Sequence, residues 1–158
     1  MSTEGGVVTG DDLTAADSAT AWRTVERLND AQIDQLVDLY RGESWCANRR
    51  LEDVERMLAH TDVIVALVEG PDDALVGFAR VLTDFVYRAT LYDVIVRADR
   101  RGSGLGAELL DRVVNHPRLR EVDYIDLFCR PEMIPFYRRW GFSEDMGALL
   151  MMRRKKGE

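Results

Sequence analysis

The chain has 158 residues, of which 46% are hydrophobic, and a formal net charge of −7. This length suits a single domain with one buried core and leaves no room for two catalytic domains. The acidic balance repels nucleic acid and anionic membrane surfaces, and no apolar run approaches the roughly 18 residues that a membrane helix needs. We therefore expect no nucleic-acid and no membrane partner.

The N-terminus lacks the basic and apolar regions of a secretory leader, which favours a cytoplasmic protein. Two cysteines, Cys46 and Cys129, are too few for a disulfide framework or a metal site, so we expect them to pack and expect no metal. Residues 1–19 are rich in Gly, Thr, Asp and Ala and predict a flexible tail. Residues 20–158 are then the single domain.

The first predicted element is a strand over residues 20–28, around Trp22 and Val25. Asn29 and Asp30 can begin a helix, because short polar side chains cap the free N–H groups of a first turn. The apolar residues of this helix share one face: Ile33, Leu36, Val37 and Tyr40. A second helical pattern follows Gly42, with Leu51, Val54, Met57 and Leu58.

Two β-rich runs, 62–69 and 75–82, flank the turn-like segment 70–73 and predict an antiparallel hairpin. A third run, 90–97, should extend the sheet. Because side chains alternate along a strand, Leu91, Asp93 and Ile95 should share one face and Tyr92, Val94 and Val96 the other.

The second half of the chain alternates helices and strands. Leu105, Leu109, Leu110, Val113 and Val114 have helical spacing, and the pair His116-Pro117 should end that helix. A strand is expected over 122–129, then a short helix over 134–140 that Gly141 ends, and a last strand over 148–152.

Between the third strand and its helix lies the glycine-rich run Arg100-Arg101-Gly102-Ser103-Gly104-Leu105-Gly106. A strand, a glycine turn and a helix start leave several backbone N–H groups directed at one point, which favours an anion. The two arginines add positive charge to an acidic protein. The run therefore predicts a phosphate-binding loop, although glycines can also serve a turn alone.

Three kinds of phosphate loop compete for this run. A nucleotide-binding P-loop needs a lysine after its last glycine, and the chain has none there. The dinucleotide fingerprint matches in relaxed form as Gly102-x-Gly104-x-x-Ala107, with Asp123 and Asp126 near the distance of a ribose-binding acid. That fold usually opens with this unit, however, whereas a hairpin precedes it here.

The third possibility is the pyrophosphate site of coenzyme A. Arg101-x-x-Gly104-x-Gly106 matches the Arg/Gln-x-x-Gly-x-Gly/Ala signature of the GNAT superfamily of acetyl-CoA-dependent N-acetyltransferases. Downstream, residues 136–142 resemble the Phe-Tyr-x-x-x-Gly-Phe segment of the same superfamily. The two motifs occur in the right order, with a predicted helix and strand between them. From about residue 20 to residue 152, the chain resembles a GNAT protein.

The resemblance implies an α/β (α+β) fold: a mixed, mostly antiparallel central sheet with a parallel split pair and helices on both faces. It implies acetyl-CoA as cosubstrate, with coenzyme A held by Ile95, Val96, Arg100, Arg101, Gly102, Ser103, Gly104, Leu105 and Gly106. Many relatives have an asparagine six residues before the Phe-Tyr pair and an alanine three before it; Arg130 and Met133 stand at these positions.

The resemblance also assigns the acid that protonates the leaving thiolate to Tyr137, whose phenol has an ordinary pKa near 10. The amine's proton is predicted to leave through Asp93, with Glu132 a weaker candidate. Asp93 could instead form a structural ion pair with Arg80 or Arg88. The backbone of Ile95 and Val96 resembles the strand that pairs with pantetheine, and a backbone N–H there could hold the thioester oxygen.

The variable wall of the superfamily corresponds to the predicted helix-loop-helix with Tyr40, Trp45 and Arg49, which could contact a small-molecule or peptide amine, although packing is the usual role of such residues. The leading hypothesis is N-acetylation of a primary amine by direct transfer in a ternary complex. A non-catalytic acyl-CoA-binding module and a dinucleotide-binding oxidoreductase are the alternatives. A homodimer, permitted by the apolar last strand, stays open.

Overall fold

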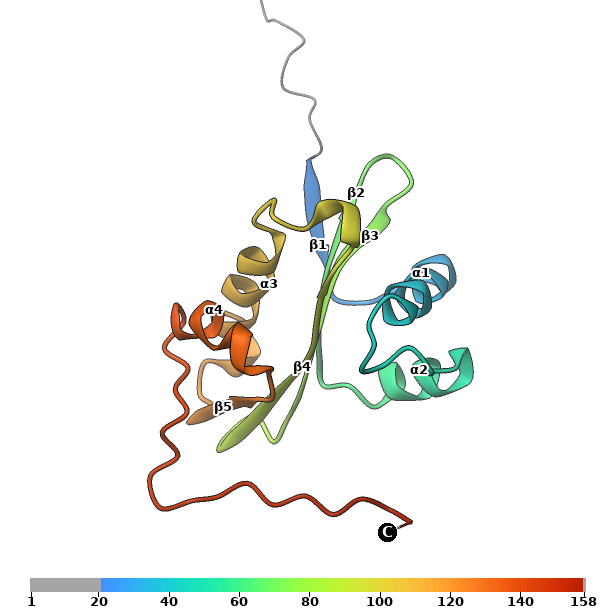
Figure 1. Cartoon of the computed structure of the whole chain (residues 1–158). Helices are drawn as coiled ribbons and strands as arrows, with labels where there is room; N and C mark the ends of the chain where they lie inside the picture. The colour runs from blue at the N-terminus through green and yellow to red at the C-terminus, as the bar shows by residue number, and fades with distance from the viewer. Residues whose placement is uncertain (1–20, 158) are drawn as a thin grey trace, which may run out of the picture.

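The computed structural model describes residues 21–157, and the predicted tail 1–19 lies outside this range. A twisted sheet separates two layers of helices (Figure 1). The strands are β1 (Trp22–Val25), β2 (Val63–Glu69), β3 (Ala74–Thr83), β4 (Arg88–Val96) and β5 (Tyr124–Leu127). The helices are α1 (Asp30–Arg41), α2 (Leu51–Ala59), α3 (Leu105–Val114) and α4 (Ile134–Arg138), with 3₁₀ turns at Ala98–Arg100, Pro117–Leu119 and Pro131–Met133.

The sheet has the order β1-β2-β3-β4-β5, with antiparallel neighbours up to β4 and a parallel β4–β5 pair. This confirms the predicted mixed sheet and does not match the parallel doubly wound fold of the dinucleotide alternative. The β4–β5 register runs only from Arg88↔Tyr124 to Leu91↔Leu127. Beyond Leu91, no strand within residues 21–157 pairs with the outer edge of β4, so the sheet splits there.

Local sequence explains the first helix. Asn29 accepts a hydrogen bond from the backbone N–H of Gln32, whose side chain in turn accepts from the N–H of Asn29. This reciprocal pair satisfies two of the free donors at the helix start. The predicted face is buried at Leu36, Val37 and Tyr40, which confirms the helix that the apolar spacing predicted.

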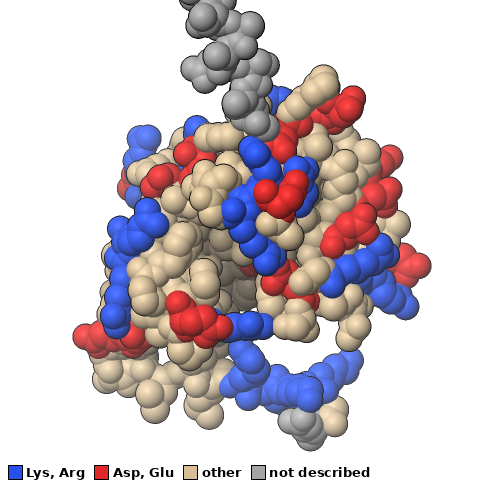
Figure 2. All heavy atoms as spheres, turned by 45° about the horizontal axis from the view of Figure 1, so that its top comes forward, with Lys and Arg blue, Asp and Glu red and all other residues tan. Residues whose placement is uncertain are grey.

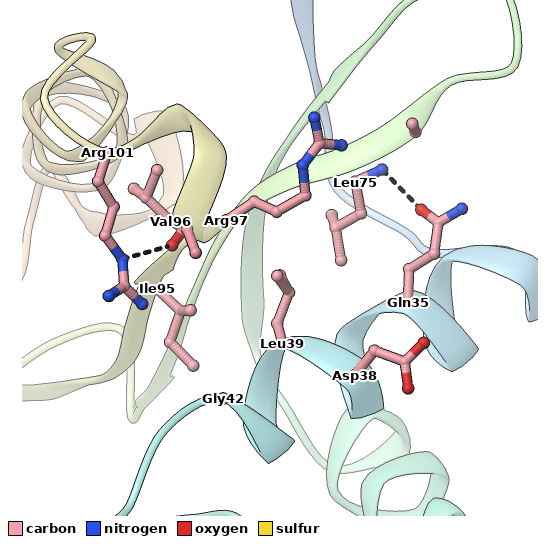
Figure 3. A pocket seen from close by; sticks show the side chains of 11 residues that line it. Gln35, Asp38, Leu39, Gly42, Leu75, Ile95, Val96, Arg97 and Arg101 are labelled. Atoms are coloured by element: carbon pink, nitrogen blue, oxygen red, sulfur yellow. Dashed lines mark hydrogen bonds between the residues drawn. The ribbon is translucent and has the colours of Figure 1, made fainter.

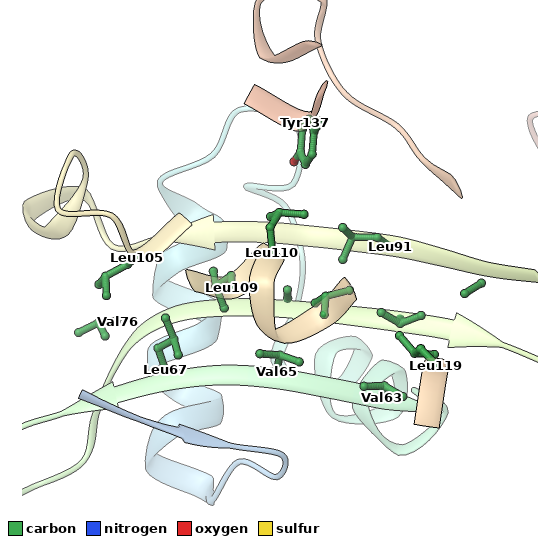
Figure 4. Close-up of a cluster of buried hydrophobic side chains, with 14 residues drawn as sticks. Val63, Val65, Leu67, Val76, Leu91, Leu105, Leu109, Leu110, Leu119 and Tyr137 are labelled. Atoms are coloured by element: carbon green, nitrogen blue, oxygen red, sulfur yellow. The ribbon is translucent and has the colours of Figure 1, made fainter. Parts of the chain in front are cut away.

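The two faces of the sheet carry separate cores. On one face α3 packs its leucines over β2, β3 and β4, and the ring of Tyr137 lies at the edge of this cluster, above Leu110 in Figure 4. On the other face α1 and α2 bury Leu36, Tyr40 and Val54 against Phe78 of β3. The sheet therefore has a helical layer on each side, as predicted, and its split edge lies between the two layers.

One prediction about β4 is wrong. Leu91 belongs to the core on the α3 side, whereas Ile95 belongs to the core under α1 and α2. Asp93 has φ +57°, and the β3–β4 register shifts between Phe78 and Arg80. This β-bulge inserts one extra residue, so the alternation before it does not continue after it. Asp93 and Ile95 face α1 and α2, and Leu91 does not.

The predicted last strand over 148–152 is also wrong. This segment has no strand structure, and Leu149, Leu150, Met151 and Met152 are exposed. A period of apolar residues predicts a strand only where a neighbouring strand can pair with it. Helix α4 is shorter than predicted, and Gly141 follows it with φ +83°, the left-handed conformation of a helix-ending glycine.

Candidate active site

A cleft of about 980 Å³ opens where β4 and β5 separate. The face shown in Figure 2 is hollowed, and lysine and arginine side chains border the hollow. The cleft joins the glycine loop, the outer edge of β4, the end of β5, the α4 segment and the α1–α2 loop. Its lining includes Glu43, Trp45, Arg49, Tyr92, Asp93, Ile95, Val96, Arg100, Arg101, Gly102, Gly104, Gly106, Cys129, Arg130, Glu132, Tyr137, Arg139 and Arg153.

The glycine loop leaves space for a ligand at its backbone. Gly102 and Gly104 have φ values of +75° and +87°, and a Cβ atom on either would meet nothing within 4 Å. Gly104 is the residue before α3, a position that turns the first N–H groups of the helix outward. Gly106 faces the ring of Phe136, 3.5 Å from where its Cβ would lie. The loop can therefore approach an anion closely.

Both arginines of the loop have carboxylate partners within the protein. Arg100 pairs with Glu69 at 2.8 Å, and Arg101 pairs with Glu43 of the α1–α2 loop. The Nε of Arg101 also donates to the carbonyl of Val96 (Figure 3). Arg101 lies between the cleft and a second pocket of about 480 Å³, which Leu39 and other residues of α1 border. The Arg101–Glu43 bridge thus connects the predicted phosphate loop to the predicted acceptor wall.

The open edge of β4 offers backbone donors to the cleft. The backbone N–H of Arg97, the residue after β4, donates to the carbonyl of Val76 on β3. Because N–H groups alternate between the two edges of a strand, the N–H of Val96 points the other way, to the edge that lacks a partner. Ile95 directs its N–H toward β3, and its side chain is buried. Of these two predicted residues, Val96 has the free donor.

Tyr137 is a largely buried residue of the cleft lining. It is 9% exposed and packs edge to face against Phe136 and Phe142. Burial raises the pKa of Tyr137 to about 12, and the nearby Cys129 adds to the shift. The phenol therefore keeps its proton throughout the neutral range, as an acid for a leaving thiolate must.

Asp93 is the centre of a buried ion-pair cluster. Its carboxylate accepts two hydrogen bonds from Arg49, at 2.7 and 3.0 Å, one from Arg80 at 2.6 Å and one from the hydroxyl of Tyr40 at 2.9 Å. Burial alone would raise the pKa of Asp93, but the hydrogen bonds and charges of the two arginines outweigh it and hold this pKa below its ordinary value. Arg88, the other partner considered, pairs with Asp126 instead.

The acceptor-wall residues differ in how they meet the cleft. Tyr40 is fully buried, and burial, followed by the charge of Asp93, raises its pKa far above normal. Trp45 is 49% exposed, and the Arg49 guanidinium lies 4.3 Å from the Tyr40 ring and 5.5 Å from the Trp45 ring. Glu132 lies 3.9 Å from Arg130 on the opposite rim. Trp45 and Arg49 thus form cleft surface, and Tyr40 supports them from below.

Sequence reasoning missed several residues of the cleft. Glu43, Arg139 and Arg153 line it, and Cys129, expected to pack, is exposed there. The glycine motif gives no signal for Glu43, which lies 58 positions before Arg101. By contrast, Cys46 is buried as expected.

Within residues 21–157 no group of three or more His, Cys, Asp or Glu side chains is placed to hold a metal ion, and no helix is long and apolar enough to cross a bilayer. A family model described as an acetyltransferase (GNAT) domain matches residues 59–144, which include the glycine loop, the split strands and Tyr137. The chain belongs to the GNAT family of acetyltransferases. Its fold and its family make the protein an acetyltransferase.

Curated relatives support this assignment. An uncharacterized N-acetyltransferase of Porphyra purpurea is 35% identical over 116 residues, 69% of this chain and 67% of the relative. The chloroplastic GCN5-related N-acetyltransferase 1 of Arabidopsis thaliana is 30% identical over 139 residues, 86% of this chain and 68% of the relative. A solved structure from Xanthomonas campestris pv. campestris, assigned to the GNAT family, has a TM-score of 0.72 at 26% identity and covers 85% of this chain and 93% of that one.

Proposed function

We propose that this protein transfers an acetyl group from acetyl-CoA directly to a primary amine, with both substrates bound at once. The observation that supports this best is the shared cleft, which brings the glycine loop, the free edge of β4 and Tyr137 into one cavity next to the α1–α2 loop. Direct transfer needs an anion site for the coenzyme, a donor for the thioester oxygen and an acid for the thiolate. Each need has a candidate in this lining.

The residues present suit coenzyme A. The open backbone at Gly102 and Gly104, at the start of α3, fits a pyrophosphate, and Arg100 and Arg101 can exchange their carboxylate partners for it. Ser103 and Leu105 complete the loop, and Leu105 also anchors α3 in the core. When bound, acetyl-CoA supplies the thioester that is attacked. The N–H of Val96 would stabilise the oxygen on which negative charge develops.

The phenol of Tyr137 would protonate the departing thiolate. Its pKa of about 12 keeps it in the acid form, and its ring is fixed by aromatic neighbours. Two roles are open to Asp93 on the acceptor side: proton acceptor, as predicted, or anchor of the acceptor wall. Its four hydrogen bonds and lowered pKa favour the anchor. Glu132, more exposed, is the other carboxylate that could accept the amine's proton.

A curated relative guides the choice of amines to be tried as acceptors. One curated relative, 34% identical over 103 residues, is a chloroplastic serotonin N-acetyltransferase from Oryza sativa subsp. japonica. This similarity covers 64% of our chain and 52% of the relative, and it puts arylalkylamines on the list of amines to be tried. The cytoplasmic location and the homodimer stay predictions, which cell fractionation and sedimentation would test.

The test is incubation with acetyl-CoA and a panel of amines, peptides and acetylatable metabolites, following free thiol and identifying products by mass spectrometry. Release of thiol that depends on an added amine, with an N-acetylated product, is the expected result. Binding of coenzyme A without amine-dependent thiol release would contradict catalysis and favour a non-catalytic acyl-CoA module. The Tyr137→Phe protein is the matched control, because it keeps the aromatic ring and lacks only the hydroxyl that we propose protonates the thiolate.

A further inference from the structure

The buried cluster around Asp93 holds more positive than negative charge. One carboxylate, 2% exposed, is shared by two guanidinium groups, those of Arg49 and Arg80, whose side chains are 28% and 10% exposed. In residues 21–157 neither arginine has another carboxylate partner. Buried charges in proteins are normally balanced by a partner, because removing an unpaired charge from water is costly. The cluster therefore lacks one negative charge.

Arg49 has a donor edge that the protein leaves free. Its two terminal nitrogens, Nη1 and Nη2, hold the oxygens of Asp93, and Nη1 also contacts the sulfur of Met57 at 3.8 Å. A guanidinium has five N–H donors in a fixed fork. The remaining pair, on Nε and Nη2, has no acceptor within the described part of the chain. Arg49 lines the cleft, so this pair is available to a bound molecule.

The same donor edge binds carboxylates elsewhere in the molecule. Nε and Nη2 of Arg97 hold the two oxygens of Asp99 at 2.6 and 3.0 Å. Nε and Nη2 of Arg138 hold Glu144 at 3.3 and 2.7 Å. Two parallel N–H donors match the two oxygens of a carboxylate or phosphate. On Arg49, which lines the cleft, the corresponding edge has no acceptor among residues 21–157.

The coenzyme and the cleft's own acids do not supply the missing charge. A strand rises about 3.3 Å per residue, so Val96 at the phosphate loop lies about 10 Å along β4 from Asp93. Of the other acids in the lining, Glu43 pairs with Arg101 and Glu132 lies beside Arg130. The acceptor is the remaining component of the reaction that can bring a negative charge to Arg49.

We infer that the acceptor of this enzyme is an amine that also carries an anionic group, a carboxylate or a phosphate, which binds the free Nε–Nη2 edge of Arg49. This inference rests on the proposed acetyl transfer and names its substrate class. The residual positive charge has a second effect, because it disfavours a bound ammonium and so favours the unprotonated amine that attacks the thioester.

The test compares amines that differ by one charge. Serotonin and 5-hydroxytryptophan differ by a carboxylate, and ethanolamine and phosphoethanolamine differ by a phosphate. For each pair kcat/KM is measured with saturating acetyl-CoA, and we expect the anionic member to be preferred by about tenfold or more, the scale of a charge-assisted bidentate contact. The two pairs also show whether carboxylate or phosphate is the better group.

Two variants separate binding from structure. Arg49→Gln removes the excess charge and leaves Asp93 and Arg80 as a balanced pair, so the protein should fold and the preference should fall to about one. Arg49→Lys keeps the charge and should retain part of the preference. A merely structural role of Arg49 would slow both members of a pair equally and leave their ratio unchanged, which would contradict the inference.

Equal rates within both pairs, or a preference for serotonin and ethanolamine, would overturn the inference and leave acetyl transfer standing. Absence of transfer to every amine would instead contradict the proposed function. Binding then decides: the coenzyme A complex is titrated by calorimetry with 5-hydroxytryptophan and with serotonin. Tighter binding of the acid, lost in Arg49→Gln, supports the inference, and equal binding refutes it.

Discussion

The two sides of the cleft are built in different ways. On the proposed coenzyme side, a short continuous segment, residues 100–106, presents backbone groups whose directions follow from left-handed glycines. On the proposed acceptor side, Tyr40, Arg49, Arg80 and Asp93 meet as side chains from α1, the α1–α2 loop, β3 and β4. A site made of backbone groups is determined by a short stretch of sequence. A cluster of side chains from distant positions forms only when the chain has folded. We therefore expect substitutions on the two sides to have different effects on stability, on coenzyme binding and on turnover.

The largest expected effect is on stability, from Asp93→Asn. Removing the one negative charge leaves Arg49 and Arg80 unpaired, and breaking a buried ion pair costs about 3–5 kcal/mol. The lowered pKa means that Asp93 stabilises the fold above its unfolded pKa, near 3.9, and that this stability is lost as pH falls through the folded pKa. Urea unfolding of both proteins should show the full difference at neutral pH and a smaller one in acid.

The same variant distinguishes the two roles of Asp93 in the reaction. If Asp93 accepts the amine's proton, the deficit in kcat/KM should narrow as pH rises toward the pKa of the amine. If Asp93 is an anchor, the ratio of wild-type to variant rates should be independent of pH. A profile of kcat/KM against pH for both proteins, beside their melting temperatures, gives the answer.

Next in size is Tyr137→Phe on the coenzyme side. The change removes a hydroxyl and keeps the ring contacts with Phe136 and Phe142. Loss of a general acid typically costs about a hundredfold or more in turnover, while acetyl-CoA affinity and melting temperature should change little. Wild-type kcat in the variant, with chemistry shown to be rate-limiting, would remove Tyr137 from the mechanism. In the wild type the raised pKa of Tyr137 should keep the phenol protonated through the neutral and mildly alkaline range.

Gly104→Val should weaken coenzyme binding by about tenfold or more. Gly104 has φ +87°, and a left-handed conformation costs an L-residue about 1–2 kcal/mol, more for a β-branched one, so the loop should shift. Gly147→Val is the matched control, since Gly147 has φ +62° and is not part of the cleft lining. Calorimetry that finds the same coenzyme A affinity in a folded Gly104→Val protein would refute the site.

The smallest effect expected is a gain from Glu43→Gln. Arg101 would lose its carboxylate partner and would meet the pyrophosphate without first giving up an ion pair. Because exposed ion pairs are worth about 1 kcal/mol or less, coenzyme A should bind about twofold to fivefold more tightly. Glu52→Gln, at an exposed pair with Arg50, should leave the affinity unchanged. Weaker binding in Glu43→Gln would show that the bridge assists the loop.

The parts of the molecule that depend on local sequence were predictable, and the parts that depend on distant partners were not. Apolar spacing, the cap at Asn29 and the glycine motif are local, and they predicted α1, α3 and the glycine turn between β4 and α3. The bulge at Asp93 left no trace in the residue pattern, because a positive φ at an aspartate depends on the partners that hold it. The prediction of a strand over 148–152 was wrong for a related reason, because a strand forms only where a neighbouring strand is placed to pair with it. The charge balance around Arg49 could not be predicted from the sequence, because Arg49, Arg80 and Asp93 come together only in the folded chain.

Because β4 contains a bulge, its geometry should depend more on the number of residues in the strand than on which residues they are. Before Asp93 the strand directs side chains to α3 at Leu91, and after it the phase is reversed, so that Val96 turns its N–H to the open edge. Deleting a single residue here would restore plain alternation and rotate everything downstream by half a period. The edge that we propose meets the thioester would then present a carbonyl oxygen where it now presents an N–H donor, whereas conservative substitutions at the same positions would leave that donor in place. Natural insertions and deletions in this region should therefore occur in the loops that flank β4 and not within the strand.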